Sequence, residues 1–90
     1  MVDETELNEK ANVICVFRRG QLHPCQPVRF EFRRREITVQ EIGLVYPIYK
    51  KGMLIHVYEL TDGAADYRLE LNANRLTWRV TREADHYVGA

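Results

Sequence analysis

The sequence predicts an all-β fold, a bent antiparallel meander of five or six short strands that forms a small or half-open barrel. Short segments in which apolar and polar residues alternate recur along the chain, as is typical of strands with one buried face. Turn-forming residues separate most of these segments. Every connection is too short for a crossover helix, so neighbouring strands are expected to pair antiparallel.

The chain has the length of one domain, with 90 residues of which 46% are hydrophobic. We expect a single β domain over residues 12–82. The acidic segment 1–11 shows no clear period and is expected to be a flexible tail or one or two helical turns. Residues 83–90 show no pattern either and are expected to form a flexible C-terminal tail.

The first strand is expected at "VICVF" (13–17), a continuous apolar run that fits a strand covered on both faces. Residues 18–27 contain one glycine and two prolines and are expected to form a loop. The clearest alternation follows over 28–33, where Val28, Phe30 and Phe32 share one face.

Alternation resumes after the arginine run with Ile37 and Val39 on one face. Near Glu41–Gly43 the apolar phase shifts by one residue, which beside a glycine indicates a β-bulge. Residues 46–52 are expected to form a loop with unusual apolar content. Three further strands are expected at 53–60, 67–71 and 75–81, separated by turns at 61–66 and 72–74. Within the last strand, Trp78 should lie between Leu76 and Val80 on the inward face and be largely buried.

The arginine run "RRR" at 33–35 admits two interpretations. The interpretation that we favour is a solvated sheet face and a hairpin tip, because charged outer faces are common on antiparallel sheets and protect their edges. Arginine is strained at positive φ, so we expect a wider loop or a type I turn with a bulge, not a tight two-residue turn. Residues 18–36 nevertheless carry six arginines against two glutamates, a local excess of positive charge in a chain of zero net charge.

The second interpretation is a binding surface. Single-stranded nucleic acid is held by aromatic side chains beside cations, and protein interfaces also favour tyrosine and arginine. If the arginine turn and the 46–52 segment lie at the same end of the sheet, they could form such a surface. The candidate binding residues are Arg33, Arg34, Arg35, Tyr46, Ile48, Tyr49, Lys50 and Lys51.

Motifs for catalysis or for metal binding are missing from the sequence. It contains no serine, its five glycines are isolated, and its histidines and cysteines lack the spacing of metal ligands. We therefore expect no enzymatic activity, no metal and no cofactor. Cys15 is expected to be a core thiol and Cys25 a thiol in a loop, both of them free.

Part of the pattern resembles a group of small bacterial all-β domains whose function is not established. His-Pro, a Phe-x-aromatic strand, a basic hairpin turn and a late tryptophan strand carry this resemblance over residues 13–82. The matching residues are His23, Pro24, Phe30, Phe32, Arg35 and Trp78. The group favours glycine in the hairpin turn, from which Arg34 departs. The resemblance implies a compact antiparallel domain and no activity.

Taken together, the sequence predicts a non-enzymatic protein-interaction or self-association module, with a protein partner or a second copy as its ligand. Single-stranded nucleic acid is the alternative ligand, although a sequence pI of about 6.8 is low for a nucleic-acid-binding domain. No apolar run approaches the roughly 20 residues that span a bilayer, so we expect no membrane partner and a cytoplasmic location.

Overall fold

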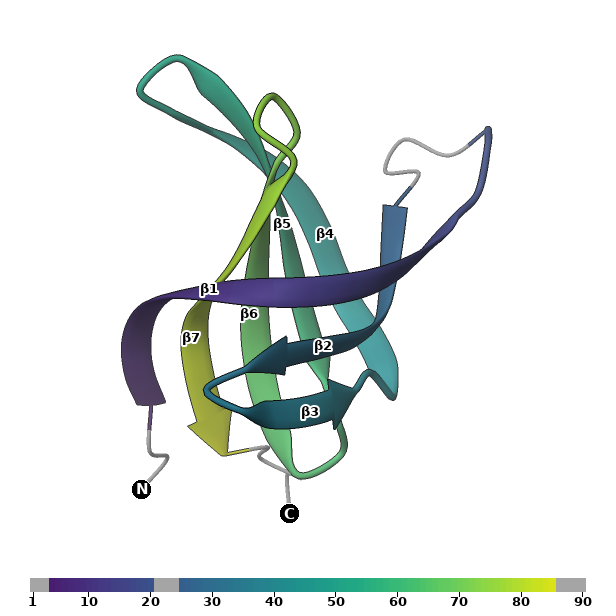
Figure 1. The fold of residues 1–90 in the computed structure, drawn as a ribbon, viewed down its shortest axis with the longest axis vertical. Coiled ribbons are helices and arrows are strands. Elements are labelled where there is room, and N and C mark those ends of the chain that lie inside the picture. Colours follow the sequence, from purple (N-terminus) through teal and green to yellow (C-terminus); the bar gives the residue numbers. More distant parts are fainter. Residues whose placement is uncertain (1–3, 21–24, 86–90) are drawn as a thin grey trace.

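Seven strands form one antiparallel sheet in the computed structural model, which describes residues 4–20 and 25–85. The strands are β1 (Glu4–Phe17), β2 (Cys25–Phe32), β3 (Arg35–Thr38), β4 (Glu41–Lys50), β5 (Met53–Thr61), β6 (Ala65–Asn72) and β7 (Thr77–Asp85). Their order in the sheet is β3-β2-β1-β7-β6-β5-β4 (Figure 1). The all-β antiparallel prediction is confirmed, but there are seven strands instead of five or six. The sheet also does not close as a barrel, because the edge strands β3 and β4 do not pair with each other.

Strand β1 joins the two parts of the sheet. Residues 4–11 pair with β7, whereas residues 12–17 pair with β2. Figure 1 shows the β1–β3 part lying across strands β4–β7. The prediction of a tail over 1–11 is therefore wrong from Glu4 onward. The meander is also interrupted, since β1 and not β4 follows β3 and β2 in the sheet.

The sequence pattern does not predict the first half of β1 as a strand, because not all of its inward positions are apolar. Leu7 and Ala11 pack against the core, but the residue midway between them on the same face is the charged Glu9. The segment therefore shows no alternation of apolar and polar residues. At the other end of the chain, β7 runs to Asp85, so the predicted C-terminal tail is wrong for residues 83–85. The rest of that tail, like residues 1–3, lies outside the described residues.

Two hairpins are tighter than the sequence predicted. Arg33 and Arg34 form a two-residue turn between β2 and β3, with φ of 51° and 63°. Lys51 and Gly52 close the β4–β5 hairpin in the same way, with φ of 51° and 76°. Positive φ at both central residues is the type I′ turn, whose twist matches that of the flanking strands. The predicted wide loop at 33–35 and the predicted loop at 46–52 are both wrong, because strand twist outweighs the strain of a non-glycine residue.

Two of the register shifts in the sheet bear on the predicted faces of the strands. The register shift beside Gly43 confirms the predicted bulge in β4. A second register shift, in the β1–β2 ladder, leaves Val28 without a partner residue in β1. As a result Pro27, and not Val28, lies on the buried face of β2. Val28 is consequently exposed, and the prediction that it shares a face with Phe30 and Phe32 is wrong.

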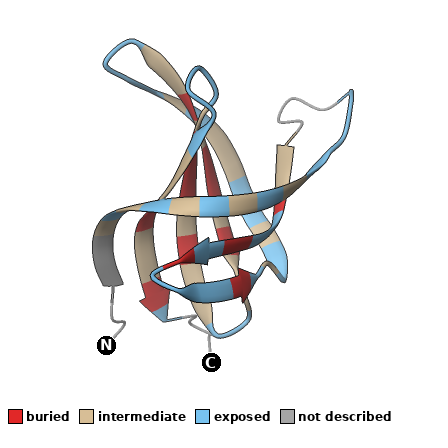
Figure 2. Cartoon of the chain, in the orientation of Figure 1, coloured by how far each residue is buried: buried red, intermediate tan, exposed pale blue. Residues whose placement is uncertain are grey.

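The core lies between the β1–β3 part and strands β5–β7. Its buried members are Phe30, Phe32, Ile37, Tyr58, Leu60, Tyr67, Leu69, Leu71 and Val80, part of the red bands in Figure 2. The rings of Phe30 and Phe32 meet the Tyr67 ring edge-on, with centroids 5.3 and 5.9 Å away. The predicted inward positions of these two phenylalanines and of Ile37 are thus confirmed.

Trp78 is partly buried and packs against the core, which confirms its predicted inward position. Its ring packs against Tyr58, with centroids 5.5 Å apart, but another part of the side chain lines a surface hollow. Leu76 was predicted to share the inward face with Trp78. It instead lies in the β6–β7 turn with φ of 54° and is 80% exposed, because the turn extends further than the asparagines indicated.

A matched pair of leucines tests the position of the core. Leu69 is fully buried, so Leu69→Ala should lower the free energy of unfolding by about 3–4 kcal/mol through lost burial and a new cavity. Leu76→Ala removes the same atoms from an exposed turn and should cost less than about 0.5 kcal/mol. Urea unfolding of both variants measures the difference. Equal losses for the two variants would contradict this assignment of the core.

The core tyrosines predict how stability falls at alkaline pH. Burial raises the pKa of Tyr58 to about 12 and that of Tyr67 to about 12, and the carboxylates of Asp62 and Glu83 add to the second shift. In the unfolded chain both phenols ionise near pH 10. The stabilising contribution is therefore complete below about pH 10 and is lost as pH rises towards 12, by about 1.4 kcal/mol per pH unit for each tyrosine. Chemical denaturation between pH 9 and about 12 should give a shallower slope for Tyr58→Phe than for the parent chain; equal slopes would refute the prediction.

Candidate functional site

The arginine turn is bound to the rest of its own chain. The Arg33 guanidinium lies 3.1 Å from a carboxylate oxygen of Glu9 on β1. Arg35 donates to Glu83 on β7 at 2.8 Å, and its guanidinium lies 4.9 Å from the centre of the Phe32 ring. These two ion pairs attach the β2–β3 hairpin to β1 and β7. Such pairing favours a structural role for the arginines.

The β4–β5 hairpin contributes a different contact network. The Tyr46 hydroxyl donates to Glu59 at 3.1 Å, and the Lys50 ammonium donates to Glu70 at 2.6 Å across the intervening β5. Of the other candidates here, Ile48 is half-buried, while Tyr49 and Lys51 are exposed. The end of this hairpin projects away from the β2–β3 turn (Figure 1). The structure therefore does not bring Arg33–Arg35 together with residues 46–51 in one groove.

Two glutamates organise the face of β4–β7 that points away from the core. Glu59 accepts hydrogen bonds from Tyr46 and Arg68 and lies 3.7 Å from Arg82. Glu70 is buried and also accepts a 2.8 Å hydrogen bond from Thr81. Burial and the bond to Glu59 raise the pKa of Tyr46. These carboxylates each have several partners within the sheet, so the network links strands β4, β5, β6 and β7.

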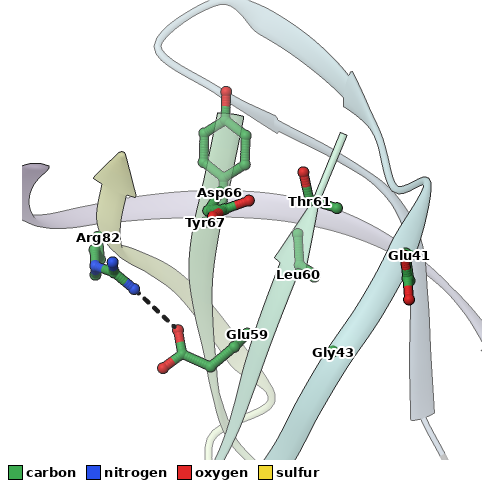
Figure 3. A pocket seen from close by; sticks show the side chains of 8 residues that line it. All are labelled: Glu41, Gly43, Glu59, Leu60, Thr61, Asp66, Tyr67 and Arg82. Carbon is green, nitrogen blue, oxygen red and sulfur yellow. Dashed lines mark ion pairs between the residues drawn. The ribbon is translucent and has the colours of Figure 1, made fainter. Parts of the chain in front are cut away.

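A pocket of about 290 Å³ lies beside this network (Figure 3). In the figure the Glu59–Arg82 ion pair lies on one side of it and Glu41 on the other. Asp66 and Tyr67 also line the pocket, whereas serine, cysteine and histidine do not. Of the carboxylates that line this pocket, Glu59 is held in ion pairs with Arg68 and Arg82.

Metal-binding groups do not assemble in the described ranges, 4–20 and 25–85. No three histidine, cysteine, aspartate or glutamate side chains gather there in a way that could hold an ion. His23 and His86 lie outside these ranges, and His56 is half-buried in β5. Cys25 was predicted in a loop but begins β2 and is half-buried.

A larger hollow opens where β1 and β7 separate. The two strands pair up to Ala11 and Trp78 and then diverge, as β1 turns towards β2. Between them lies a space of about 530 Å³ lined by residues 10–13 and 76–79, here called the β1–β7 cleft. Its lining combines apolar groups, such as Val13 and Trp78, with the cations Lys10 and Arg79. In this lining, as far as the structure describes it, there is no carboxylate.

Beyond the cleft, residues 12–17 of β1 and 25–29 of β2 form a two-stranded ribbon, here called the arm. Its outer face is apolar and exposed, with Ile14 at 51% and Val16 at 40% exposure, and Phe17 at the end of the strand, on the opposite face, is 70% exposed. Exposed positions alternate along this part of β1 in Figure 2. Exposed apolar side chains that gather at one place on a surface commonly mark an interaction site.

The main chain of the arm is also unprotected. Residues 12–17 pair with β2 on one edge, and no described strand pairs with the other edge. The segment "VICVF" contains no proline, glycine or charge, the features that protect edge strands from pairing. By contrast the edge strand β4 carries Gly43 in a bulge, Pro47 and Lys50.

The arginines that follow the arm differ from those of the β2–β3 hairpin. Arg18 and Arg19 follow the arm directly, and neither has an ion-pair partner among the described residues. Arg33 and Arg35 are neutralised by glutamates. Two adjacent exposed arginines without a described ion-pair partner thus lie directly after the arm, whereas the turn that the sequence singled out keeps one, Arg34.

The sequence reasoning missed the arm because an apolar run indicates burial on both faces. The structure covers only the Val13 and Cys15 face of this run, since none of the described strands lies over the other. The signal that could have indicated exposure is the direct junction of "VICVF" with "RRG", where apolar surface meets charge without a turn residue between them.

Comparisons with known proteins returned nothing that matches this chain, whether family models, curated proteins or solved structures. The described residues include no helix of the length and apolarity that crossing a membrane requires. The site is therefore interpreted from its own geometry.

The turn geometry makes a prediction for Arg34. Its φ of 63° is strained for any residue with a Cβ, and no described residue pairs with its side chain. Arg34→Gly should raise the free energy of unfolding by about 0.5–1 kcal/mol, after the entropy cost of glycine in the unfolded chain is counted. Arg34→Ala removes the same charge but keeps the Cβ and should bring no gain. Thermal unfolding of the two variants decides, and a gain for alanine equal to that for glycine would exclude turn strain as the cause.

Proposed function

We propose that this chain is a non-enzymatic protein-interaction module that binds an extended acidic segment of a partner protein at the β1–β7 cleft and the arm. The observation that carries the proposal is the unpaired, unprotected apolar edge of residues 12–17 beside that cleft. An added strand would gain main-chain hydrogen bonds from this edge and side-chain contacts from the cleft, as in other β-augmentation complexes.

Charge favours an acidic partner. Lys10 and Arg79 line the cleft, and Arg18 and Arg19 lie just beyond the arm. Acidic side chains flanking an apolar strand would meet these cations at both ends of the edge. Complementary charge at the rim of an interface mainly raises the association rate and the specificity.

A second copy of the chain fits the edge less well. Antiparallel pairing of two arms would bring the end of each segment beside the start of the other. Arg18 and Arg19 of one copy would then lie close to Lys10 of the other, an unfavourable juxtaposition of like charges. A partner with the opposite charge avoids this repulsion.

Single-stranded nucleic acid is a second candidate, favoured by one observation. The Phe17 side chain is 70% exposed directly beside Arg18 and Arg19, and an exposed ring next to cations is the usual platform for a stacked base. The surface first considered for this ligand, Arg33–Arg35 with Tyr46 and Tyr49, is divided between two distant hairpins. The arm offers one such ring, so protein remains the ligand that we propose.

Peptide binding tests the proposal. A labelled peptide with alternating valines flanked by aspartates should bind the full chain in fluorescence anisotropy, and a peptide with lysines in place of the aspartates should not. Reversing Arg18 and Arg19 to glutamate should weaken binding at least tenfold, which is about 1.4 kcal/mol. Arg34→Glu is the matched control, since Arg34 is also an exposed arginine without a described partner, and should bind like the parent chain.

Several outcomes would overturn this proposal. Equal binding of the two peptides, or an equal loss in Arg34→Glu, would exclude recognition at the arm. A dimer in light scattering that the peptide cannot dissociate would make a second copy the occupant. Micromolar binding of single-stranded DNA or RNA that falls steeply with salt and is lost in the Arg18 and Arg19 variant would establish the nucleic-acid alternative.

A further inference from the structure

Cys15 and Cys25 are neighbours on one face of the arm. In the β1–β2 ladder Cys15 lies opposite Pro27, and Cys25 lies opposite Phe17. Side chains two positions apart on a strand share a face, so the two cysteines are diagonal partners across the ribbon. This face is opposite to that of Ile14 and Val16 and turns towards the core, where both thiols are half-buried.

The two thiols also influence each other's ionisation. Burial raises the pKa of Cys15 to about 11, and a hydrogen bond and charge repulsion from the Cys25 sulfur add to the shift. The Cys25 main chain is held in place as well, because its carbonyl oxygen accepts a hydrogen bond from the buried Tyr58 hydroxyl. The structure thus holds two free thiols together at the end of a two-stranded ribbon.

We propose that Cys15 and Cys25 are a reversible dithiol–disulfide pair that can crosslink the two strands of the arm. The oxidant is a small-molecule disulfide of the glutathione class. One cysteine thiolate attacks a sulfur of oxidised glutathione and displaces one glutathione. The other thiolate then attacks the protein sulfur of this mixed disulfide and displaces the second glutathione. The protons of the two cysteine thiols end on the two released glutathiones, and the pair loses two electrons.

Diagonal geometry explains why the crosslink would be reversible. Diagonal residues on antiparallel strands lie roughly 7–8 Å apart between Cα atoms, slightly beyond the roughly 4.4–6.8 Å that unstrained disulfides use. Closing the bond must therefore draw the strands together by about an ångström. Because Tyr58 holds Cys25, this movement falls mainly on β1, whose other edge is unpaired over residues 12–17. A disulfide formed with such strain is reduced more easily than a structural one.

This inference does not depend on the proposed partner. The sulfur atoms and the apolar surface of Ile14 and Val16 lie on opposite faces of the same ribbon. A crosslink on the inner face leaves the outer face in place, so redox behaviour and peptide binding can be measured separately.

The test uses the full chain, reduced and then equilibrated in a series of reduced and oxidised glutathione mixtures. Alkylation of the remaining thiols followed by mass spectrometry of the intact chain should show a monomer that has lost two hydrogen atoms. Proteolytic mapping should find Cys15 joined to Cys25. The oxidised chain should unfold at a temperature higher by roughly 5 °C, and excess reduced glutathione should reverse both changes.

Single-cysteine variants provide the control. Cys15→Ser and Cys25→Ser should each accept one glutathione as a stable mixed disulfide, and neither should show the temperature shift. A parent chain that instead carries two separate glutathiones, or that forms only intermolecular disulfides, would overturn the proposal. So would two thiols that stay reduced at every mixture while the native fold is retained, as judged by tryptophan emission.

Discussion

The dual pairing of β1 is the constraint on which the rest of the structure depends. One strand bonds to β7 with its first half and to β2 with its second, so the sheet must fold across itself where the pairing changes. That fold places Phe30 and Phe32 of β2 over Tyr67 of β6 and creates the core. It also creates the β1–β7 cleft, because β1 diverges from β7 after Ala11 to pair with β2 and leaves a space between the two strands.

Ion pairs supplement the apolar packing that holds the β2–β3 hairpin against the other strands. The β2–β3 hairpin lies at one end of the sheet and is short, and its contact with the body is supplemented by Arg33 with Glu9 and Arg35 with Glu83. Half-exposed pairs of this kind add at most about 1 kcal/mol each, so they orient the hairpin more than they stabilise it. The conspicuous arginine run is thereby explained largely within the chain.

The arm and the residues that follow it combine three properties. They have exposed apolar side chains, a main-chain edge with which no described strand pairs, and two adjacent arginines, Arg18 and Arg19, that no described carboxylate neutralises. The inner face of the arm holds the two thiols against the core. A small domain can leave such an extension exposed only because the remaining strands already bury a sufficient core, with Leu69 and Val80 fully enclosed.

The sequence by itself determined the strand class, most of the inward positions and the bulge at Gly43, because alternation and turn residues act over a few neighbours. It also favoured a solvated face and a hairpin tip for the arginine run, and the ion pairs of Arg33 and Arg35 agree with that interpretation. Only the tertiary structure decided that residues 4–11 form a strand, that "VICVF" is covered on one face, and that the arginine turn and the β4–β5 hairpin lie apart. Each of these depends on which distant strand lies beside a segment, and long-range pairing leaves little trace in local pattern. The candidate site could not be predicted for the same reason, because whether a segment is an edge depends on whether another strand pairs beside it.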